Sequence, residues 1–227
     1  TKWNSGRFPE IQTLIMEDAF NNLYNFDKKY NNIIVGVDEA GRGPWAGPVV
    51  SAAVILDFNK IDLYREINDS KKLTEKKREK LFDLITNNCI SYSIAEISHE
   101  IIDEINILNA TLMSMENAIL KIKEKFDLVI VDGIFKPKIE NIRIECVKDG
   151  DAKSLSIAAA SILAKVYRDR LMSYFDKVYP EYGFKNHKGY GTREHIEALK
   201  NYGICPIHRK TYKPIKKLLK QVQKNGK

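Results

Sequence analysis

One segment near the start of the chain puts charge where a fold normally buries apolar side chains. Residues 33–37 have the composition of a buried β-strand, and Asp38 and Glu39 follow directly. A Gly-Arg-Gly-Pro sequence comes next, at residues 41–44. Buried carboxylates need a cation or hydrogen bonds, glycines let backbone N–H groups approach a ligand, and a guanidinium matches phosphate. The segment therefore indicates a metal site for phosphodiester cleavage, although a solvent-exposed turn could have the same local sequence.

Length and composition are those of an ordinary globular protein. The 227 residues suit one large domain, or one domain with a small appendage, and 44% of them are hydrophobic. No stretch approaches the roughly 18 apolar residues of a membrane span, and residues 1–10 lack an apolar signal core. Three widely separated cysteines suggest neither a disulfide framework nor a zinc site. We expect a cytoplasmic protein with no membrane partner, and no feature requires more than a monomer.

The net charge of +7 is unevenly distributed. Residues 185–227 contain 12 Lys and Arg but only two acidic residues, whereas the rest of the chain has 25 basic and 28 acidic residues. A basic C-terminal segment beside an acidic core suggests a polyanionic partner that is steered toward a cation-dependent site. The alternative is a solvated basic tail.

Hydrophobic patterns predict an α/β protein with a mixed five-stranded sheet. Strands are expected at about residues 32–37, 48–56, 91–97, 128–133 and 142–147. Helices are expected at about residues 74–87, 98–122, 154–178, 192–201 and 214–223. Residues 1–30 are interpreted as an N-terminal extension, expected to be helical. Residues 31–227 are interpreted as one catalytic domain with a basic helical segment from about residue 185.

Acidic residues are predicted to converge at one edge of this sheet. The first strand leads to Asp38 and the fourth to Asp132, so parallel pairing of the two strands would bring both carboxylates together. Asp151 precedes a long helix, whose positive dipole end favours an ionised carboxylate. Carboxylates that meet in this way require hard divalent cations, Mg²⁺ or Mn²⁺. Two such ions can activate water and stabilise a leaving oxygen.

Each acid also has a structural interpretation. Asp132 could belong to a turn with Gly133, and Asp151 could cap the following helix. Asp149 is the nearest rival of Asp151, which we prefer because Gly150 frees the backbone before it.

The small residues at 157–165 are interpreted as a surface for close helix packing. Residues 182–192 interleave aromatic, basic and glycine residues, a composition that suits contacts with sugar, base and phosphate.

Taken together, these motifs closely resemble the ribonuclease HII family, the type 2 ribonucleases H. The matching segments occur in the family's order between about residues 32 and 213: 38–44 with 46–50, 69–73, 108–111, 131–133, 150–151, 158–166, 187–192 and 206–209. One Asp-Glu-x-Gly match would be weak, whereas the ordered set is highly specific.

The resemblance implies a ribonuclease H-like fold and an endonuclease that cuts the RNA strand of RNA–DNA hybrids. It also implies cleavage 5′ of a single ribonucleotide in duplex DNA, the entry to ribonucleotide excision repair, with 3′-hydroxyl and 5′-phosphate products. The implied metal-binding catalytic carboxylates are Asp38, Glu39, Asp132 and Asp151. The implied substrate-binding residues are Gly41, Arg42 and Gly43 at the ribose 2′-hydroxyl, with Arg42 also on phosphate, Lys71 at the backbone and Tyr190 on the next deoxyribose.

Several details refine this hypothesis. The Gly41–Gly43 triplet argues against the sister family ribonuclease HIII, which lacks it. Trp45, where the family often has Leu, is expected to affect packing rather than chemistry. His187 and His208 are expected to form structural hydrogen bonds. Two other hypotheses are a nucleic-acid-binding module with structural acids and another phosphoryl-transfer enzyme of this fold, such as an integrase-like or Holliday-junction nuclease.

Overall fold

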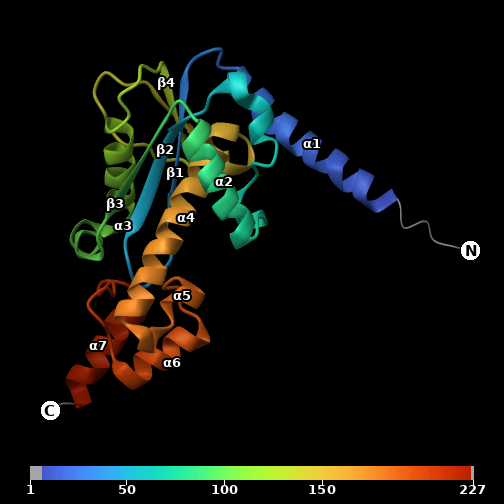
Figure 1. Cartoon of the computed structure of the whole chain (residues 1–227). Coiled ribbons are helices and arrows are strands. Elements are labelled where there is room, and N and C mark those ends of the chain that lie inside the picture. The colour runs from blue at the N-terminus through green and yellow to red at the C-terminus, as the bar shows by residue number, and fades with distance from the viewer. Residues whose placement is uncertain (1–6, 226–227) are drawn as a thin grey trace, which may run out of the picture.

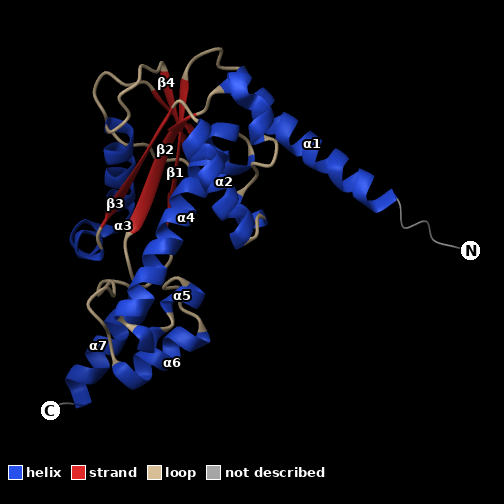
Figure 2. Ribbon diagram, in the orientation of Figure 1, coloured by secondary structure: helices blue, strands red, loops and turns tan. Residues whose placement is uncertain are grey.

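A five-stranded mixed sheet forms the centre of the molecule. The computed structural model describes the backbone of residues 7–225 and the side chains of residues 17–221. The strands are β1 (Ile34–Ala40), β2 (Val49–Ile55), β3 (Ser91–Ile97), β4 (Leu128–Asp132) and β5 (Ile144–Val147). Their order is β3-β2-β1-β4-β5, with β2 antiparallel to both of its neighbours, β1 and β3, and with β4 and β5 parallel to β1 (Figure 2). The predicted mixed sheet is confirmed, including the parallel pairing of β1 with β4.

Seven α-helices surround and extend the sheet in the described part of the chain. They are α1 (Arg7–Lys28), α2 (Glu75–Asn88), α3 (His99–Leu120), α4 (Leu155–Val178), α5 (Phe184–His187), α6 (Arg193–Tyr202) and α7 (Lys213–Asn225). The side chains of Thr74, Ser98 and Thr192 accept hydrogen bonds from the first turns of α2, α3 and α6. These N-caps are the ones that the sequence predicts.

Two helical layers cover the two faces of the sheet (Figure 1). Side chains of α1, α2 and α4 form one apolar core with β2, to which α1 contributes the buried Phe20 and Leu23. The other core lies between α3 and the opposite face, where Val35 and Val37 of β1 meet Met115 of α3. Successive residues of a strand point to opposite faces, so each position on β1 belongs to one of the two layers.

The boundary predicted for the first strand was wrong. β1 does not end before the acidic pair but continues to Ala40, because its antiparallel ladder with β2 extends to the pair Ala40–Val50. Asp38 and Glu39 therefore lie within the strand and point to opposite faces of the sheet. Asp38 faces α4, whereas Glu39 faces α3.

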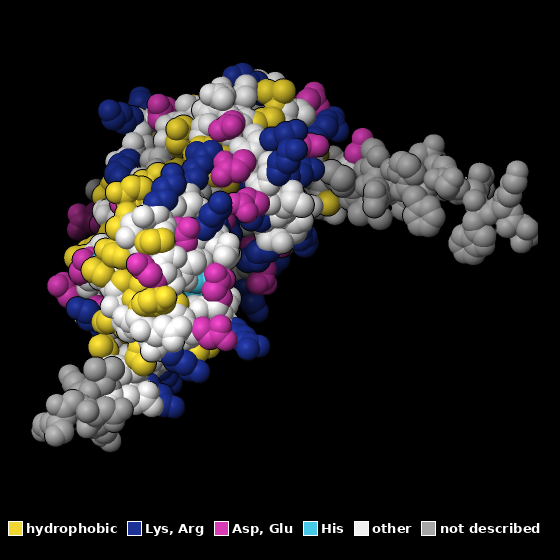
Figure 3. Space-filling model, turned by 60° about the horizontal axis from the view of Figure 1, so that its bottom comes forward, with side chains coloured by type: hydrophobic (Ala, Val, Ile, Leu, Met, Phe, Trp, Pro, Cys, Tyr) yellow, Lys and Arg dark blue, Asp and Glu magenta, His cyan; other side chains and the backbone are white. Residues whose placement is uncertain are grey.

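The C-terminal helices pack around the end of α4 that extends beyond the sheet (Figure 1). Met172 of α4, Phe184 and Ile215 lie in their shared apolar core. On the face shown in Figure 3, Lys and Arg side chains are dispersed among acidic and uncharged ones. No helix within residues 7–225 combines the length and apolar character needed to cross a membrane.

The N-terminal segment is helical where it is described. Helix α1 spans Arg7–Lys28, and residues 1–6 of the predicted extension lie outside the described residues, as does the side chain of Leu14. The division of the chain at residue 30 stays a prediction.

Candidate active site

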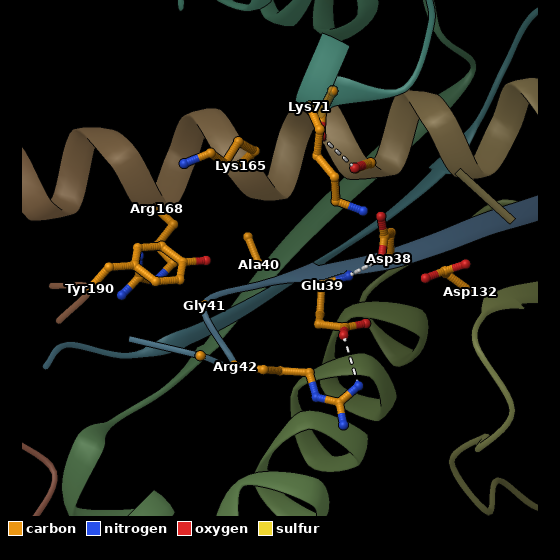
Figure 4. A pocket seen from close by; sticks show the side chains of 13 residues that line it. Asp38, Glu39, Ala40, Gly41, Arg42, Lys71, Asp132, Lys165, Arg168 and Tyr190 are labelled. Carbon is orange, nitrogen blue, oxygen red and sulfur yellow. Dashed lines mark hydrogen bonds and ion pairs between the residues drawn. The ribbon is translucent and has the colours of Figure 1, made fainter. Parts of the chain in front are cut away.

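A pocket opens where the carboxyl ends of β1 and β4 lie side by side (Figure 4). Its lining consists of Asp38, Glu39, Ala40, Gly41, Arg42, Gly43, Ser70, Lys71, Asp132, Ser161, Lys165, Arg168 and Tyr190. Eight of the nine predicted site residues are among them. The ninth, Asp151, is linked to the pocket by Lys71, whose Nζ lies 2.8 Å from the Asp151 carboxylate.

Asp38 and Glu39 carry the buried negative charge of β1. The Asp38 side chain is 4% exposed, and its Oδ1 accepts a hydrogen bond of 2.6 Å from the Glu39 N–H. Burial raises the pKa of Asp38 well above its usual value, and the carboxylates of Glu39 and Asp132 add to this rise. Burial also raises the pKa of Glu39, although Arg42, 3.3 Å away, partly offsets the effect.

Asp132, the last residue of β4, is the third carboxylate that lines the pocket. Its Oδ1 accepts a hydrogen bond from the Gly150 N–H, and burial raises its pKa. Asp151 is buried in the short 3₁₀ turn Gly150–Ala152, whereas Asp149 is exposed. Ser154, rather than Asp151, caps α4. The geometry thus favours Asp151 over Asp149 as the fourth carboxylate of the site.

The acidic group suits a hard divalent cation. Its donors are all carboxylate oxygens, the ligand type that Mg²⁺ and Mn²⁺ prefer. Burial raises the pKa values of Asp38, Glu39 and Asp132, and neighbouring carboxylates add to the rise, so a bound cation would stabilise their ionised forms. Among the described residues, no three acidic, His or Cys side chains converge closely enough to form a ready-made ion site. The donor set fits such ions, with the acids placed around the pocket rather than gathered at one point.

The opposite end of the pocket is formed by the glycine turn and Tyr190 (Figure 4). Gly41 has φ +100°, and a Cβ there would lie 2.1 Å from Arg168 Nε. A Cβ at Gly43 would lie 3.2 Å from the ring of Tyr190, which is 47% exposed. The absence of side chains at both glycines therefore keeps a shallow surface between the acids and the tyrosine ring.

Five lining residues were not proposed as site residues from the sequence: Ala40, Ser70, Ser161, Lys165 and Arg168. Three of them occupy α4, where Ser161 and Lys165 belong to the stretch interpreted as a packing surface only and Arg168 follows it. Ser161, Lys165 and Arg168 are spaced by four and three residues, so they share one helix face. Ser161 Oγ lies 2.9 Å from Ser70 Oγ, which joins α4 to the Lys71 loop. A polar stripe on an otherwise apolar helix was the available signal.

The predicted histidines and Trp45 lie outside this pocket lining. His187 Nε2 is 2.7 Å from the carbonyl oxygen of Tyr182, and His208 is fully buried among hydrogen-bond partners. The Trp45 ring packs against Gly191 and lies 5.7 Å from the ring of His195. These contacts are structural, as expected from the sequence.

Comparison with known proteins places this arrangement in a family. The family model described as Ribonuclease HII matches residues 35–215. Ribonuclease HII of Acholeplasma laidlawii is 55% identical over 211 residues, which are 93% of this chain and 99% of that protein. The ribonuclease H2 structure from Pyrococcus horikoshii OT3 superposes with a TM-score of 0.71 at 31% identity, over 85% of this chain and 99% of that one.

A more distant structure, Bst-RNase HIII in complex with Mn²⁺, gives a TM-score of 0.62 at 16% identity, over 91% of this chain and 73% of that one. This similarity shows the common ribonuclease H fold alone. The hypotheses of a non-catalytic binding module and of a different nuclease of this fold are not supported, because the family match includes the acids and the glycine turn. The chain belongs to the ribonuclease HII family and is an endonuclease of the ribonuclease H type.

Proposed function

We propose that this enzyme cuts the RNA strand of RNA–DNA hybrids and cuts 5′ of single ribonucleotides embedded in duplex DNA. The products would carry 3′-hydroxyl and 5′-phosphate ends. The observation that carries the proposal is one pocket with carboxylates at one end and the Gly41–Gly43 turn with Tyr190 at the other. The pocket would thus combine a cleaving centre with a surface for sugar recognition.

Asp38, Glu39, Asp132 and Asp151 would hold two divalent cations, Mg²⁺ or Mn²⁺. When bound, such a pair supplies an activated water and charge stabilisation of the leaving oxygen. Asp38 and Asp132 are fixed by N–H donors from the backbone, which hold their carboxylates at the mouth of the pocket. Lys71 bonds Asp151 while 79% of its side chain is exposed, so the ammonium can also contact an incoming phosphate.

The recognition end would distinguish ribose from deoxyribose. Backbone groups of Gly41, Arg42 and Gly43 would contact the 2′-hydroxyl, the group that separates RNA from DNA. The exposed ring of Tyr190 would pack on the following deoxyribose, where a second 2′-hydroxyl would collide with it. Arg42 is exposed and reaches Glu39, so its guanidinium is also placed to contact phosphate.

A gel cleavage assay tests the proposal. The substrate is a DNA duplex with one ribonucleotide, incubated with Mg²⁺ or Mn²⁺ beside an all-DNA duplex. We expect one cut on the 5′ side of the ribonucleotide and none in the control. Asp132→Asn should reduce turnover by about 10³-fold or more, because it removes an anionic ligand of the two cations, while binding in Ca²⁺ persists.

An intact ribonucleotide substrate with either metal, despite tight binding, would contradict the proposal. Cleavage of hybrids without cleavage at single ribonucleotides would restrict it to its first part. The cytoplasmic location and the monomeric state inferred from the sequence stay predictions.

A further inference from the structure

A buried arginine, Arg209, binds the backbone carbonyls of the glycine turn. Arg209 is fully buried, and its guanidinium donates hydrogen bonds to four backbone carbonyls of one loop. These bonds are Nε to Gly47 O at 2.9 Å, Nη1 to Arg42 O at 3.1 Å, and Nη2 to Gly41 O at 2.6 Å and Pro48 O at 3.1 Å. Two of the four acceptors belong to the turn that would recognise the ribose.

Tyr212 completes this arrangement, which we call the carbonyl clamp (Arg209 and Tyr212). The Tyr212 hydroxyl accepts a hydrogen bond from Arg209 Nη1 at 2.8 Å and donates one to Arg42 O at 2.6 Å. The Arg42 carbonyl is thus bound twice, once by each clamp residue. Both residues are more than 165 positions away from the turn in sequence, as the separations of 168 and 170 residues for these bonds show.

The clamp determines where the N–H groups of the turn point. Every peptide bond of the described backbone is trans, so the C=O and N–H of one peptide unit point in opposite directions. Because the carbonyls of Gly41 and Arg42 point inward to the clamp, the N–H groups of Arg42 and Gly43 point outward. In the described part of the chain, neither of these N–H groups donates a backbone hydrogen bond. Both residues line the pocket, so two free donors are presented there.

The chemistry of this position requires a guanidinium. Arg209 forms no ion pair among the described residues, and burial lowers its pKa. Its charge is instead stabilised by hydrogen bonds to carbonyl oxygens in a fixed planar geometry, which the three donors of an ammonium on a flexible stem cannot reproduce. Burying a guanidinium without an acidic partner costs desolvation free energy. The need to fix the backbone of the glycine turn explains why Arg209 is buried here.

We propose that Arg209 and Tyr212 are positioning residues that orient the Gly41–Gly43 turn and thereby set the enzyme's preference for a 2′-hydroxyl. This inference rests on the proposed function, since it explains how the recognition end of that site keeps its shape. The clamp does not touch the substrate. It acts through the direction of two N–H groups, so its loss should reduce discrimination between ribose and deoxyribose rather than the chemistry alone.

The test measures discrimination without turnover. Kd is measured in Ca²⁺ for a duplex with one ribonucleotide and for the same duplex made of DNA only. The discrimination ratio is the Kd for the all-DNA duplex divided by the Kd for the duplex with one ribonucleotide. This Kd ratio is independent of the fraction of protein that is folded, because both duplexes titrate the same preparation. The variants are Tyr212→Phe, which removes one hydroxyl from a half-buried side chain, and Arg209→Lys. Tyr182→Phe is the matched control, because it removes a hydroxyl that donates to Gly203 O, outside the turn.

We expect Tyr212→Phe to reduce the Kd ratio about 5-fold, the effect of one hydrogen bond of about 1 kcal/mol. Arg209→Lys should reduce the ratio further, and Tyr182→Phe should keep the wild-type ratio. If Arg209→Lys does not fold, Tyr212→Phe decides the question alone. A wild-type ratio retained by Tyr212→Phe would overturn the clamp while leaving the proposed function intact. A wild-type ratio near one would instead reject ribose recognition in the proposed function, and the clamp with it.

Discussion

At the scale of single residues, the two glycines of the recognition turn serve different purposes. Gly41 has a positive φ and lies against the Arg168 side chain, so both its conformation and its lack of Cβ are needed for folding. Gly43 has no such backbone requirement, and its nearest neighbour is the partly exposed ring of Tyr190. One glycine supports the structure, and the other keeps space for the substrate.

Alanine substitutions should separate these purposes. Gly41→Ala is expected to lower the free energy of unfolding by about 1–3 kcal/mol, because Ala is strained at this φ. Gly43→Ala is expected to unfold at nearly the wild-type temperature, since the Tyr190 ring can move aside, but to lose about 10-fold in kcat/KM on a single-ribonucleotide duplex. Thermal unfolding and cleavage kinetics of both variants check this. A stable Gly41→Ala protein, or an unimpaired Gly43→Ala enzyme, would contradict the assignment.

The acids of the site could be predicted from sequence, but the buried arginines could not. Asp38 and Asp132 each follow a recognisable apolar run, and a local rule about strand ends brings them together. Arg168 and Arg209 follow no such local rule, because their backbone partners are carbonyls 120 or more residues away, apart from Lys188 O, which is 20 residues from Arg168. A lone basic residue in a helix or loop has the same local pattern on a surface as in a core.

At the scale of elements, each strand could be located from the sequence, but the end of β1 and the interruption of α3 could not. Acidic residues are disfavoured in strands, and only the pairing of Ala40 with Val50 shows that β1 continues through them. One helix was predicted over about residues 98–122, yet α3 is interrupted at Asn106, which has φ 67°. The Asn106 side chain accepts hydrogen bonds from the N–H groups of Leu108 and Asn109 and so restarts the helix.

Helix α1 is anchored to α4 by a buried carboxyl. Asp27 Oδ2 accepts hydrogen bonds of 2.8 Å from both the N–H and the hydroxyl of Ser156, in the first turn of α4. Its Oδ1 is buried and has no partner among the described residues. Burial raises the pKa of Asp27 to about 6, against a usual value of 3.8. The folded protein therefore binds this proton more tightly than the unfolded chain does.

The pH dependence of Asp27→Asn should reveal this anchor. A raised carboxyl pKa means that the folded state binds the proton more tightly, so this contribution to stability is complete below pH 3.8 and is lost as the pH rises through about 6. We expect the free energy of unfolding of the wild type, relative to Asp27→Asn, to fall by about 2 kcal/mol from pH 4 to pH 7. Urea unfolding across this range measures it, with the exposed Asp18→Asn on the same helix as control. A constant difference between wild type and Asp27→Asn would exclude the effect.

At the scale of the whole molecule, the active site lies at the junction of two parts. Three of the four carboxylates come from the sheet and Asp151 comes from the turn before α4, whereas Tyr190 and the clamp residues come from the C-terminal helical part. Helix α4 runs through both and contributes Ser161 and Lys165 to the pocket on the way (Figures 1 and 4). The relative position of acids and tyrosine therefore depends on how firmly the C-terminal part is held.

A chain of hydrogen bonds through two buried histidines supports that part. The Cys205 N–H donates to His208 Nδ1 at 2.9 Å, and His208 Nε2 lies 3.0 Å from His195 Nε2. His195 Nδ1 lies 3.0 Å from the carbonyl oxygen of Tyr190. One assignment satisfies every group: His208 donates from Nε2 to His195, and His195 donates from Nδ1 to Tyr190. It requires both rings to be neutral, and it ends on the residue that would contact the deoxyribose.

Acid should therefore loosen the C-terminal part. Burial lowers the pKa of His195 and of His208 from 6.5 to about 4, and a proton on either ring would set two N–H donors against each other. Because the unfolded state binds these protons more tightly, the stability contributed by the pair is complete above pH 6.5 and is lost as the pH falls toward 4. We expect each ring to contribute about 2 kcal/mol less to the free energy of unfolding at pH 5 than at pH 7. The contribution of Asp27 rises over the same range and opposes this loss.

Urea unfolding of Asp27→Asn, which lacks the opposing contribution, should show the loss directly. Adding His208→Gln should flatten its pH profile, whereas adding His99→Gln, a histidine outside the chain of bonds, should not. Equal slopes for the two double variants would show that the buried pair does not control acid stability.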